Sequence, residues 1–239
     1  MIDIEERIDN AVKKYHFTSS IHFKSFSEEE KSTLFEKKKL ITLKKKEVLF
    51  EQDTYSRGLY IVKSGRIKVQ QLNFDGSNQI LFIYNEGDIF GYRNLITSER
   101  NNVSATALEP SEIELVPAET FMHLLKTSNT LNQQLLRAVS DEFTVLTNRI
   151  NIFAQRGIKE RLSLALLLLN KKYTEPHTTE YFSEIMLSRK DLADYVGTSI
   201  ENIVRTIQYF KQKKLIKTMG KSIVITHPEN LLILSGIYY

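Results

Sequence analysis

The residues of this sequence best suited to a specific chemistry lie on one expected helix, residues 199–212. Ile203, Ile207 and Phe210 recur at helical spacing, so they should face a core. The opposite face then carries four polar residues, Glu201, Asn202, Arg205 and Gln208, and two apolar ones, Ile200 and Val204. Arginine can donate two hydrogen bonds to guanine, glutamate can accept one from cytosine, and asparagine or glutamine can pair with adenine. This face therefore has the chemistry needed to read the base edges of DNA.

A blander interpretation of the same face is open. Glu201 and Arg205 are four residues apart, so they could form only a salt bridge on a solvated helix, and such pairs contribute about 0.2 to 0.5 kcal/mol. The preceding residues favour base recognition instead. Ser188 and Ser199 can each cap a helix, and Gly197 between them permits a tight turn.

The segment around this helix has the order of a winged helix-turn-helix. Leu192, Ala193 and Val196 supply a buried face for the first of the two capped helices, and a short strand pair turns at Gly220 after the second. Lys221 at that turn can approach a phosphate. The string Met-Gly-Lys-Ser at 219–222 lacks the earlier glycine of a phosphate-binding loop, so we interpret it as a wing tip.

Residues from about 21 to 117 read as short strands rich in Ile, Val, Leu and Tyr. Gly65, Gly76 and Gly87 recur at intervals of 11 residues, and Asp75 followed by Gly76 predicts a hairpin with a primed turn. Short strands at this spacing indicate a small barrel or roll.

The pattern then changes to that of a long helix, which should begin near Thr130 and break at Gly157. Its apolar residues follow a heptad-type spacing, namely Leu136, Val139, Phe143, Leu146, Ile150 and Phe153. This seam could pack on its own domain or form a coiled coil across a dimer axis. The other faces are polar and leave a narrow stripe, which favours the dimer; their residues include Gln133, Gln134, Arg137, Asp141, Glu142 and Arg149.

Composition excludes several classes of protein. The chain has 239 residues, 41% hydrophobic and 26% charged, which suffices for two compact domains. The absence of cysteine excludes disulfides, thiolate zinc sites and cysteine-ligated iron–sulfur clusters. No run approaches the roughly 18 to 20 apolar residues of a membrane span, so we expect a cytoplasmic protein with no membrane contact. The net charge of +4 lies entirely in residues 158–239, which hold 12 Lys and Arg against 8 Asp and Glu.

Over residues 21–226, and most specifically over 187–216, the chain resembles the CRP/FNR family of bacterial transcription regulators. The resemblance implies an α+β fold with an antiparallel β-roll, a long dimerisation helix and a winged helix-turn-helix. It implies a homodimer that reads a near-palindromic operator in double-stranded DNA, with RNA polymerase as a further partner. The expected parts are an N-terminal helical segment (1–20), a cyclic-nucleotide-binding-like effector domain (21–125), the dimerisation helix (126–157) and the DNA-binding domain (158–239).

Several site residues follow from this resemblance. Glu201 and Arg205 occupy the family's base-contacting positions, whereas Ile200 stands where arginine is common, which suggests a different consensus site. Gln208 shares their outward face, and Lys221 is expected on the wing. Other positions look like phosphate contacts, namely Arg189, Ser199 and Asn202. Arg161 matches an arginine that is common in the family.

The effector pocket departs from that of the family's cyclic AMP binders. Gly91 is retained, but Tyr92 replaces the glutamate that holds the ribose, and Asn101 or Asn102 stands where the phosphate-binding arginine belongs. Loss of a charge-assisted bidentate contact predicts that cyclic AMP does not bind. Thr147 looks like part of the adenine-contacting pair. The pocket could be empty, repurposed or vestigial.

Other activities have weaker support. Arg93 and Arg100 could serve a different anion or could be exposed loop residues. The five histidines show no ligand spacing, so we predict neither haem nor metal, no cofactor and no identifiable effector; they are His16, His22, His123, His177 and His227. No catalytic motif is recognisable, so we do not expect an enzyme. The alternative function is a protein-binding module on a β-roll scaffold, which the polar outward helix face disfavours.

Overall fold

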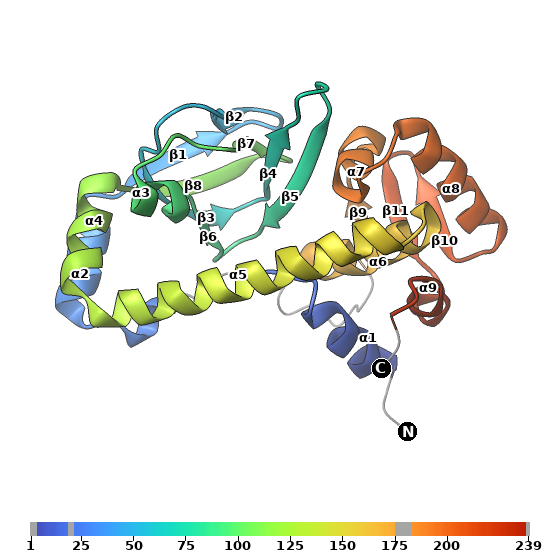
Figure 1. The fold of residues 1–239 in the computed structure, drawn as a ribbon, viewed down its shortest axis with the longest axis horizontal. Helices are drawn as coiled ribbons and strands as arrows, with labels where there is room; N and C mark the ends of the chain where they lie inside the picture. Colours follow the sequence, from blue (N-terminus) through green and yellow to red (C-terminus); the bar gives the residue numbers. More distant parts are fainter. Residues whose placement is uncertain (1–3, 19–21, 175–182, 238–239) are drawn as a thin grey trace. The chain divides into compact units, whose positions relative to one another are not determined.

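The computed structural model describes residues 4–18, 22–174 and 183–237, drawn in Figure 1. The backbone divides into two compact units. One, which we call the effector unit, is Thr18–Glu142, and the other, the DNA-binding unit, combines Met1–Phe17 with Phe143–Tyr239. Within the described ranges, no helix is both long and apolar enough to cross a membrane.

The effector unit is an antiparallel β-roll with flanking helices. Its two four-stranded sheets have the orders β1-β8-β3-β6 and β2-β7-β4-β5. The strands are β1 (Lys39–Leu43), β2 (Val48–Phe50), β3 (Gly58–Ser64), β4 (Ile67–Leu72), β5 (Asn78–Tyr84), β6 (Ile89–Phe90), β7 (Ser104–Ala107) and β8 (Ser111–Pro117). The helical elements are η1 (Phe23–Ser25), α2 (Glu28–Glu36), α3 (Tyr92–Thr97), α4 (Ala118–Thr127) and the start of α5 (Asn129–Gln155).

The three evenly spaced glycines mark turns of the roll, as expected, and each has positive φ. The predicted hairpin joins β4 to β5, but its loop is longer than a two-residue primed turn. Asn73 donates its backbone N–H to the carbonyl of Ser77 at the base of the loop. The carboxylate of Asp75 accepts from the backbone N–H of Ser77, which makes an Asx-type turn in which Gly76 takes the left-handed conformation.

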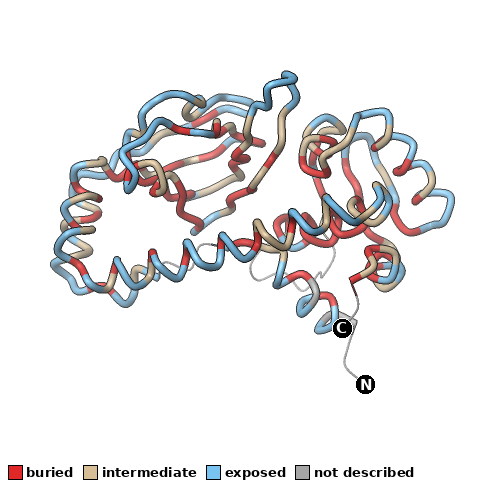
Figure 2. Tube along the Cα trace, viewed as in Figure 1, coloured by how far each residue is buried: buried red, intermediate tan, exposed pale blue. Residues whose placement is uncertain are grey.

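Helix α5 presents two stripes of different burial, visible along its length in Figure 2. Four of the six predicted seam residues are exposed in the single chain: Leu136 is 74% exposed, Val139 38%, Phe143 66% and Ile150 63%. The other two, Leu146 and Phe153, are half-buried. A second stripe, with spacings of four and three, is buried and consists of Leu131, Leu135, Ala138, Glu142, Val145 and Arg149. The placement of Glu142 and Arg149 on the polar faces was therefore wrong.

The DNA-binding unit surrounds α6, a helix buried on nearly all sides by neighbouring helices and a small sheet. Its sheet has the order β10-β11-β9. The elements are α1 (Ile4–Lys13), α6 (Ile158–Tyr173), β9 (Ile185–Met186), α7 (Arg189–Val196), α8 (Ile200–Gln212), β10 (Ile216–Met219), β11 (Ser222–Ile225) and α9 (Pro228–Leu234).

The N-terminal helix is a constituent of this unit, which the sequence did not indicate. Helix α1 packs on α6 and α9, and Ile8 and Val12 are buried. Asp9 forms an ion pair of 2.8 Å with Lys171 of α6. The carbonyl of Lys14 also accepts a hydrogen bond from the side chain of Asn148.

Candidate nucleic-acid interface

Helices α7 and α8 form the predicted helix-turn-helix, and local sequence sets its geometry. The Ser188 hydroxyl accepts from the backbone N–H of Asp191, and the Ser199 hydroxyl accepts from that of Asn202, so both predicted caps are present. Between them Gly197 has φ 71°, the left-handed conformation that ends a helix at little cost for glycine.

The predicted inward and outward faces of α8 are confirmed. Ile203, Ile207 and Phe210 are buried. Glu201, Arg205 and Gln208 are exposed, and Asn202 is half-buried. Two apolar side chains of the outward face are also accessible, with Ile200 42% and Val204 40% exposed. The helix thus presents charged, amide and apolar groups together, a mixture suited to base edges and thymine methyl groups.

The salt bridge between Glu201 and Arg205 does not form in the part of the chain that the structure describes. Arg205 instead donates from Nη2 to Oδ1 of Asn202 over 2.8 Å. A hydrogen bond from the Ser199 side chain lowers the pKa of Glu201, which therefore carries its charge at the start of the helix. Both side chains are exposed, and the salt bridge on which the alternative interpretation relied is absent from this face of the described helix.

The wing follows α8 and is joined to α7 by Arg189. Strands β10 and β11 pair from Ile216 opposite Ile225 to Met219 opposite Ser222, and Gly220 turns between them with φ 57°. Arg189 donates long hydrogen bonds of 3.4 Å and 3.5 Å to the carbonyls of Lys221 and Gly220. Partial burial lowers its pKa, although arginine stays charged at neutral pH.

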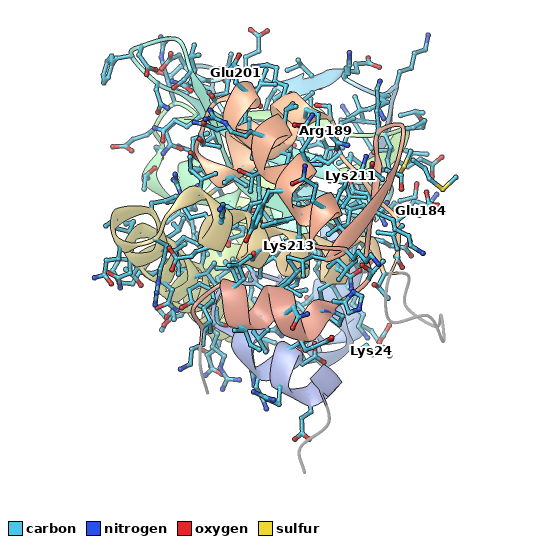
Figure 3. The ribbon with its side chains drawn as sticks, turned by 90° about the vertical axis from the view of Figure 1, so that its right-hand side faces the viewer. Lys24, Glu184, Arg189, Glu201, Lys211 and Lys213 are labelled. Atoms are coloured by element: carbon cyan, nitrogen blue, oxygen red, sulfur yellow. The ribbon has the colours of Figure 1, made fainter. Side chains whose placement is uncertain are left out.

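Positive charge surrounds this surface. Figure 3 shows Arg189 on α7, Glu201 at the start of α8, and Lys211 and Lys213 toward its end. The exposed lysines of α8, of the following turn and of the wing are Lys211, Lys213, Lys214, Lys217 and Lys221. Their charges can attract the phosphate backbone of DNA regardless of its sequence.

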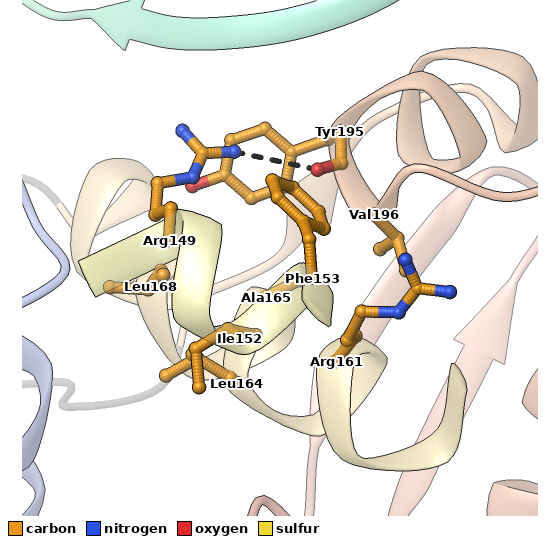
Figure 4. Close-up of a pocket in the computed structure, with 9 residues that line it drawn as sticks. All are labelled: Arg149, Ile152, Phe153, Arg161, Leu164, Ala165, Leu168, Tyr195 and Val196. Atoms are coloured by element: carbon orange, nitrogen blue, oxygen red, sulfur yellow. Dashed lines mark hydrogen bonds between the residues drawn. The ribbon is translucent and has the colours of Figure 1, made fainter. Parts of the chain in front are cut away.

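Two arginines lie behind the helix-turn-helix, around a cavity of about 20 Å³ that Figure 4 shows in close-up. Arg149 of α5 stacks on the ring of Tyr195, with Cζ 4.7 Å from the centroid, and donates to the Tyr195 carbonyl. Arg161 of α6 donates from Nη1 to the carbonyl of Gly197 over 3.1 Å. A cavity of this size holds about one water molecule. Because both arginines donate hydrogen bonds to backbone carbonyls of α7 and its turn, we assign them to positioning these segments.

The effector unit also contains a cavity of about 20 Å³. Four of the candidate pocket residues line it: Gly91, Tyr92, Arg93 and Asn101. The other two, Asn102 and Thr147, do not. Its remaining lining residues are Phe50, Val69, Tyr84, Phe90, Asn94, Val103 and Glu142.

Large aromatic side chains fill the roll around this cavity. The ring of Tyr60 stacks on those of Phe50 and Phe90, with centroids 5.3 Å apart in each pair. Tyr84 continues the stack, 4.8 Å from Phe90. Gly91 is required beside it: φ is 87°, and a Cβ there would lie 2.7 Å from a Tyr60 ring carbon. These rings leave space for little more than a water molecule.

A buried carboxyl group completes the cavity. Glu142 is 3% exposed, accepts a hydrogen bond from the Tyr92 hydroxyl over 3.2 Å and lies 3.8 Å from Nε of Arg93. Burial raises the pKa of Glu142 and also that of Tyr92. The second stripe of α5 could have revealed this group, because Glu142 continues the spacing of Leu135 and Ala138.

Within the described residues, no group of three or more histidine or acidic side chains could hold a metal ion.

A β-roll followed by a long helix and a winged helix-turn-helix defines a DNA-binding regulator with an effector-type domain. Comparison with known families agrees: residues 40–128 match the cyclic nucleotide-binding domain, and residues 160–233 match the Crp-like helix-turn-helix domain. The chain belongs to the CRP/FNR family and is a DNA-binding transcription regulator. Its relatives favour this function over that of a protein-binding module.

Two curated relatives and one solved structure illustrate the similarity. The fumarate and nitrate reduction regulatory protein of Vibrio cholerae is 28% identical over 85% of this chain and 80% of its own length. The transcriptional activator protein Anr of Pseudomonas protegens is 28% identical over 81% of this chain and 79% of its own. The structure of FixK2 from Bradyrhizobium japonicum aligns with a TM-score of 0.74 and 19% identity, covering 84% of this chain and 99% of that one.

Proposed function

We propose that the protein acts as a homodimer that binds a near-palindromic operator, with one α8 helix in each of two successive major grooves about 34 Å apart. The observation that carries this proposal is the paired exposure of the α5 seam and the outward face of α8. A solvent-facing row of large apolar side chains at heptad spacing suits a second copy of the same helix. A two-fold dimer then presents two identical reading helices.

The proposed roles of individual residues follow their chemistry. Arg205 and Glu201 contact bases, Ile200 contacts a thymine methyl, and Gln208 extends the same reading face. Lys221, Arg189 and the hydroxyl of Ser199 contact phosphates, which positions the helix without specifying sequence. As a regulator of transcription, the DNA-bound dimer is proposed to contact RNA polymerase.

The test is selection of preferred sites from random duplex DNA, followed by affinity measurements at fixed salt concentration. The proposal expects a palindromic consensus with a half-site spacing of one helical turn. Equal affinity for the selected site and for random duplex would overturn it. Copurification of RNA polymerase with the operator-bound dimer tests the polymerase contact separately.

We further propose that neither cyclic AMP nor cyclic GMP is an effector. The cavity of the effector unit offers about 20 Å³, which is space for little more than one water molecule and not for a nucleotide. Tyr92 also stands where the resemblance leads one to expect a glutamate, and Asn101 or Asn102 stands where it leads one to expect an arginine. Calorimetry with both nucleotides should give no heat of binding, and micromolar affinity for either would contradict this proposal.

A further inference from the structure

The outward face of α8 contains a short chain of hydrogen bonds that ends at Arg205. Thr198, in the turn between α7 and α8, accepts from Nδ2 of Asn202 over 3.2 Å. Oδ1 of the same amide accepts from Nη2 of Arg205 over 2.8 Å. The amide nitrogen therefore faces the turn, and the amide oxygen faces the guanidinium.

Asn202 itself is well held. Its backbone N–H donates to the Ser199 hydroxyl over 3.3 Å, and its carbonyl accepts from the Thr206 hydroxyl over 2.8 Å. Its side chain is half-buried, whereas Arg205 is exposed. A restrained amide is thus bound to a long side chain that would otherwise have many rotamers.

This arrangement leaves Arg205 able to read a base. A guanidinium has five N–H donors, and Asn202 uses one of them. Enough donors remain for the two parallel hydrogen bonds that arginine makes to guanine. Because Glu201 does not pair with Arg205, no carboxylate competes for those donors within the described helix.

We propose that Asn202 is a positioning residue, anchored by Thr198, that orients the Arg205 guanidinium for base recognition. This inference rests on the proposed function of α8 and replaces a phosphate contact as the main role of Asn202. Because Arg205 is already oriented before binding, it loses less conformational entropy when it becomes ordered on a base. This advantage affects the affinity only at the base pair that Arg205 binds.

The experiment measures the affinity of full-length protein for its selected operator, for operators with single base-pair changes and for random duplex, over a range of salt concentrations. Asn202→Ala is compared with Arg205→Ala and with the double variant. We expect Asn202→Ala to lose about three- to tenfold of the discrimination at the base pair that Arg205→Ala relaxes. Random-duplex affinity and salt dependence should be unchanged, and the double variant should match Arg205→Ala.

Two conservative substitutions in the turn provide matched controls. Thr198→Ser keeps the hydroxyl acceptor and should retain full discrimination. Thr198→Val keeps the shape, loses the acceptor and should show a smaller loss at the same base pair. Thermal unfolding of each variant checks that the fold is intact, and Thr198→Val carries the test if Asn202→Ala unfolds.

The outcomes separate the possible roles. An equal loss on every sequence, with a shallower salt dependence, identifies Asn202 as a phosphate contact and overturns the inference. Undiminished discrimination in Asn202→Ala overturns it as well. A wild-type protein with no sequence preference overturns the proposed function, whereas a discriminating wild type with an equally discriminating Asn202→Ala overturns this inference alone.

Discussion

The hydroxyl of Tyr92 donates a hydrogen bond of 3.2 Å to the carboxylate of Glu142. Tyr92 begins α3 and Glu142 lies on α5, so this bond joins the roll of the effector unit to the long helix. Arg93 approaches the other carboxylate oxygen at 3.8 Å. Burial outweighs both partners and raises the pKa of Glu142, which means that the folded protein disfavours the ionised carboxylate.

Glu142→Gln should therefore change how stability depends on pH. The folded-state pKa of Glu142 lies above its ordinary value of 4.5, so folding favours proton uptake between the two values. The contribution of Glu142 to stability is largest below the unfolded-state pKa and is lost as pH rises through the folded-state pKa. Glu142→Gln should be more stable than wild type at neutral pH, with the difference vanishing at acidic pH.

Urea unfolding at a series of pH values from about 4 to 8 measures this difference. Asp141→Asn, an exposed neighbour on the same helix, is the matched control and should follow the wild-type profile. Parallel profiles for wild type and Glu142→Gln would show that the buried carboxyl group is not linked to folding.

His16 should give a pH dependence of opposite sign. Burial, with Lys172 and Lys171 nearby, lowers the pKa of His16 to about 2. The unfolded chain binds a proton near the ordinary value of 6.5 while the folded chain does not, so stability falls as pH decreases below that value. Amide hydrogen-exchange protection of α1 should decrease at pH 5 relative to pH 7 in wild type, and much less in His16→Gln. Equal losses in both proteins would count against this role of His16.

The sequence predicts best where the physical cause is local. Caps at Ser188 and Ser199 and the turn at Gly197 depend on neighbouring residues, and the structure confirms all three. The docking of α1 depends on partners more than 130 residues away, such as the Asn148 side chain that binds the Lys14 carbonyl, so no local pattern reveals it.

Burial of polar residues is also difficult to predict from the sequence. Glu142 and Arg149 interrupt an apolar stripe whose spacing nevertheless continues through them. Polarity alone places both residues on a solvated face, whereas hydrogen bonds and ring contacts compensate their burial. Arg149, only 8% exposed, stacks on Tyr195, and Glu142 binds Tyr92. The period of the stripe was therefore a better guide to burial than residue type.

Phe143→Ser should weaken self-association. Phe143 is 66% exposed in the single chain, and burial of an aromatic side chain at a helix pair contributes about 2 to 3 kcal/mol. Because a homodimer contains two Phe143 side chains, the substitution removes both contributions, and the dissociation constant of the dimer should rise by at least tenfold. Light scattering during gel filtration measures the molar mass over a range of concentrations. Arg137→Ala, exposed on the same helix but outside the seam, should leave the dimer intact, and an unchanged mass for Phe143→Ser would refute the seam as the interface.

Arg205→Ala and Lys221→Ala should separate base recognition from phosphate binding. Arg205 can form two directed bonds to one guanine, so its removal should cost about 1 to 3 kcal/mol at the preferred base pair and relax selectivity there. Lys221 lies exposed on the wing, where a point charge attracts any phosphate backbone. Its removal should weaken binding to all sequences alike and make the salt dependence shallower. Affinities for an operator and its single-substitution variants at several salt concentrations measure both effects. If Arg205→Ala weakened binding to every variant equally, Arg205 would be a backbone contact, and base recognition would have to rest on Glu201, Ile200 and Gln208.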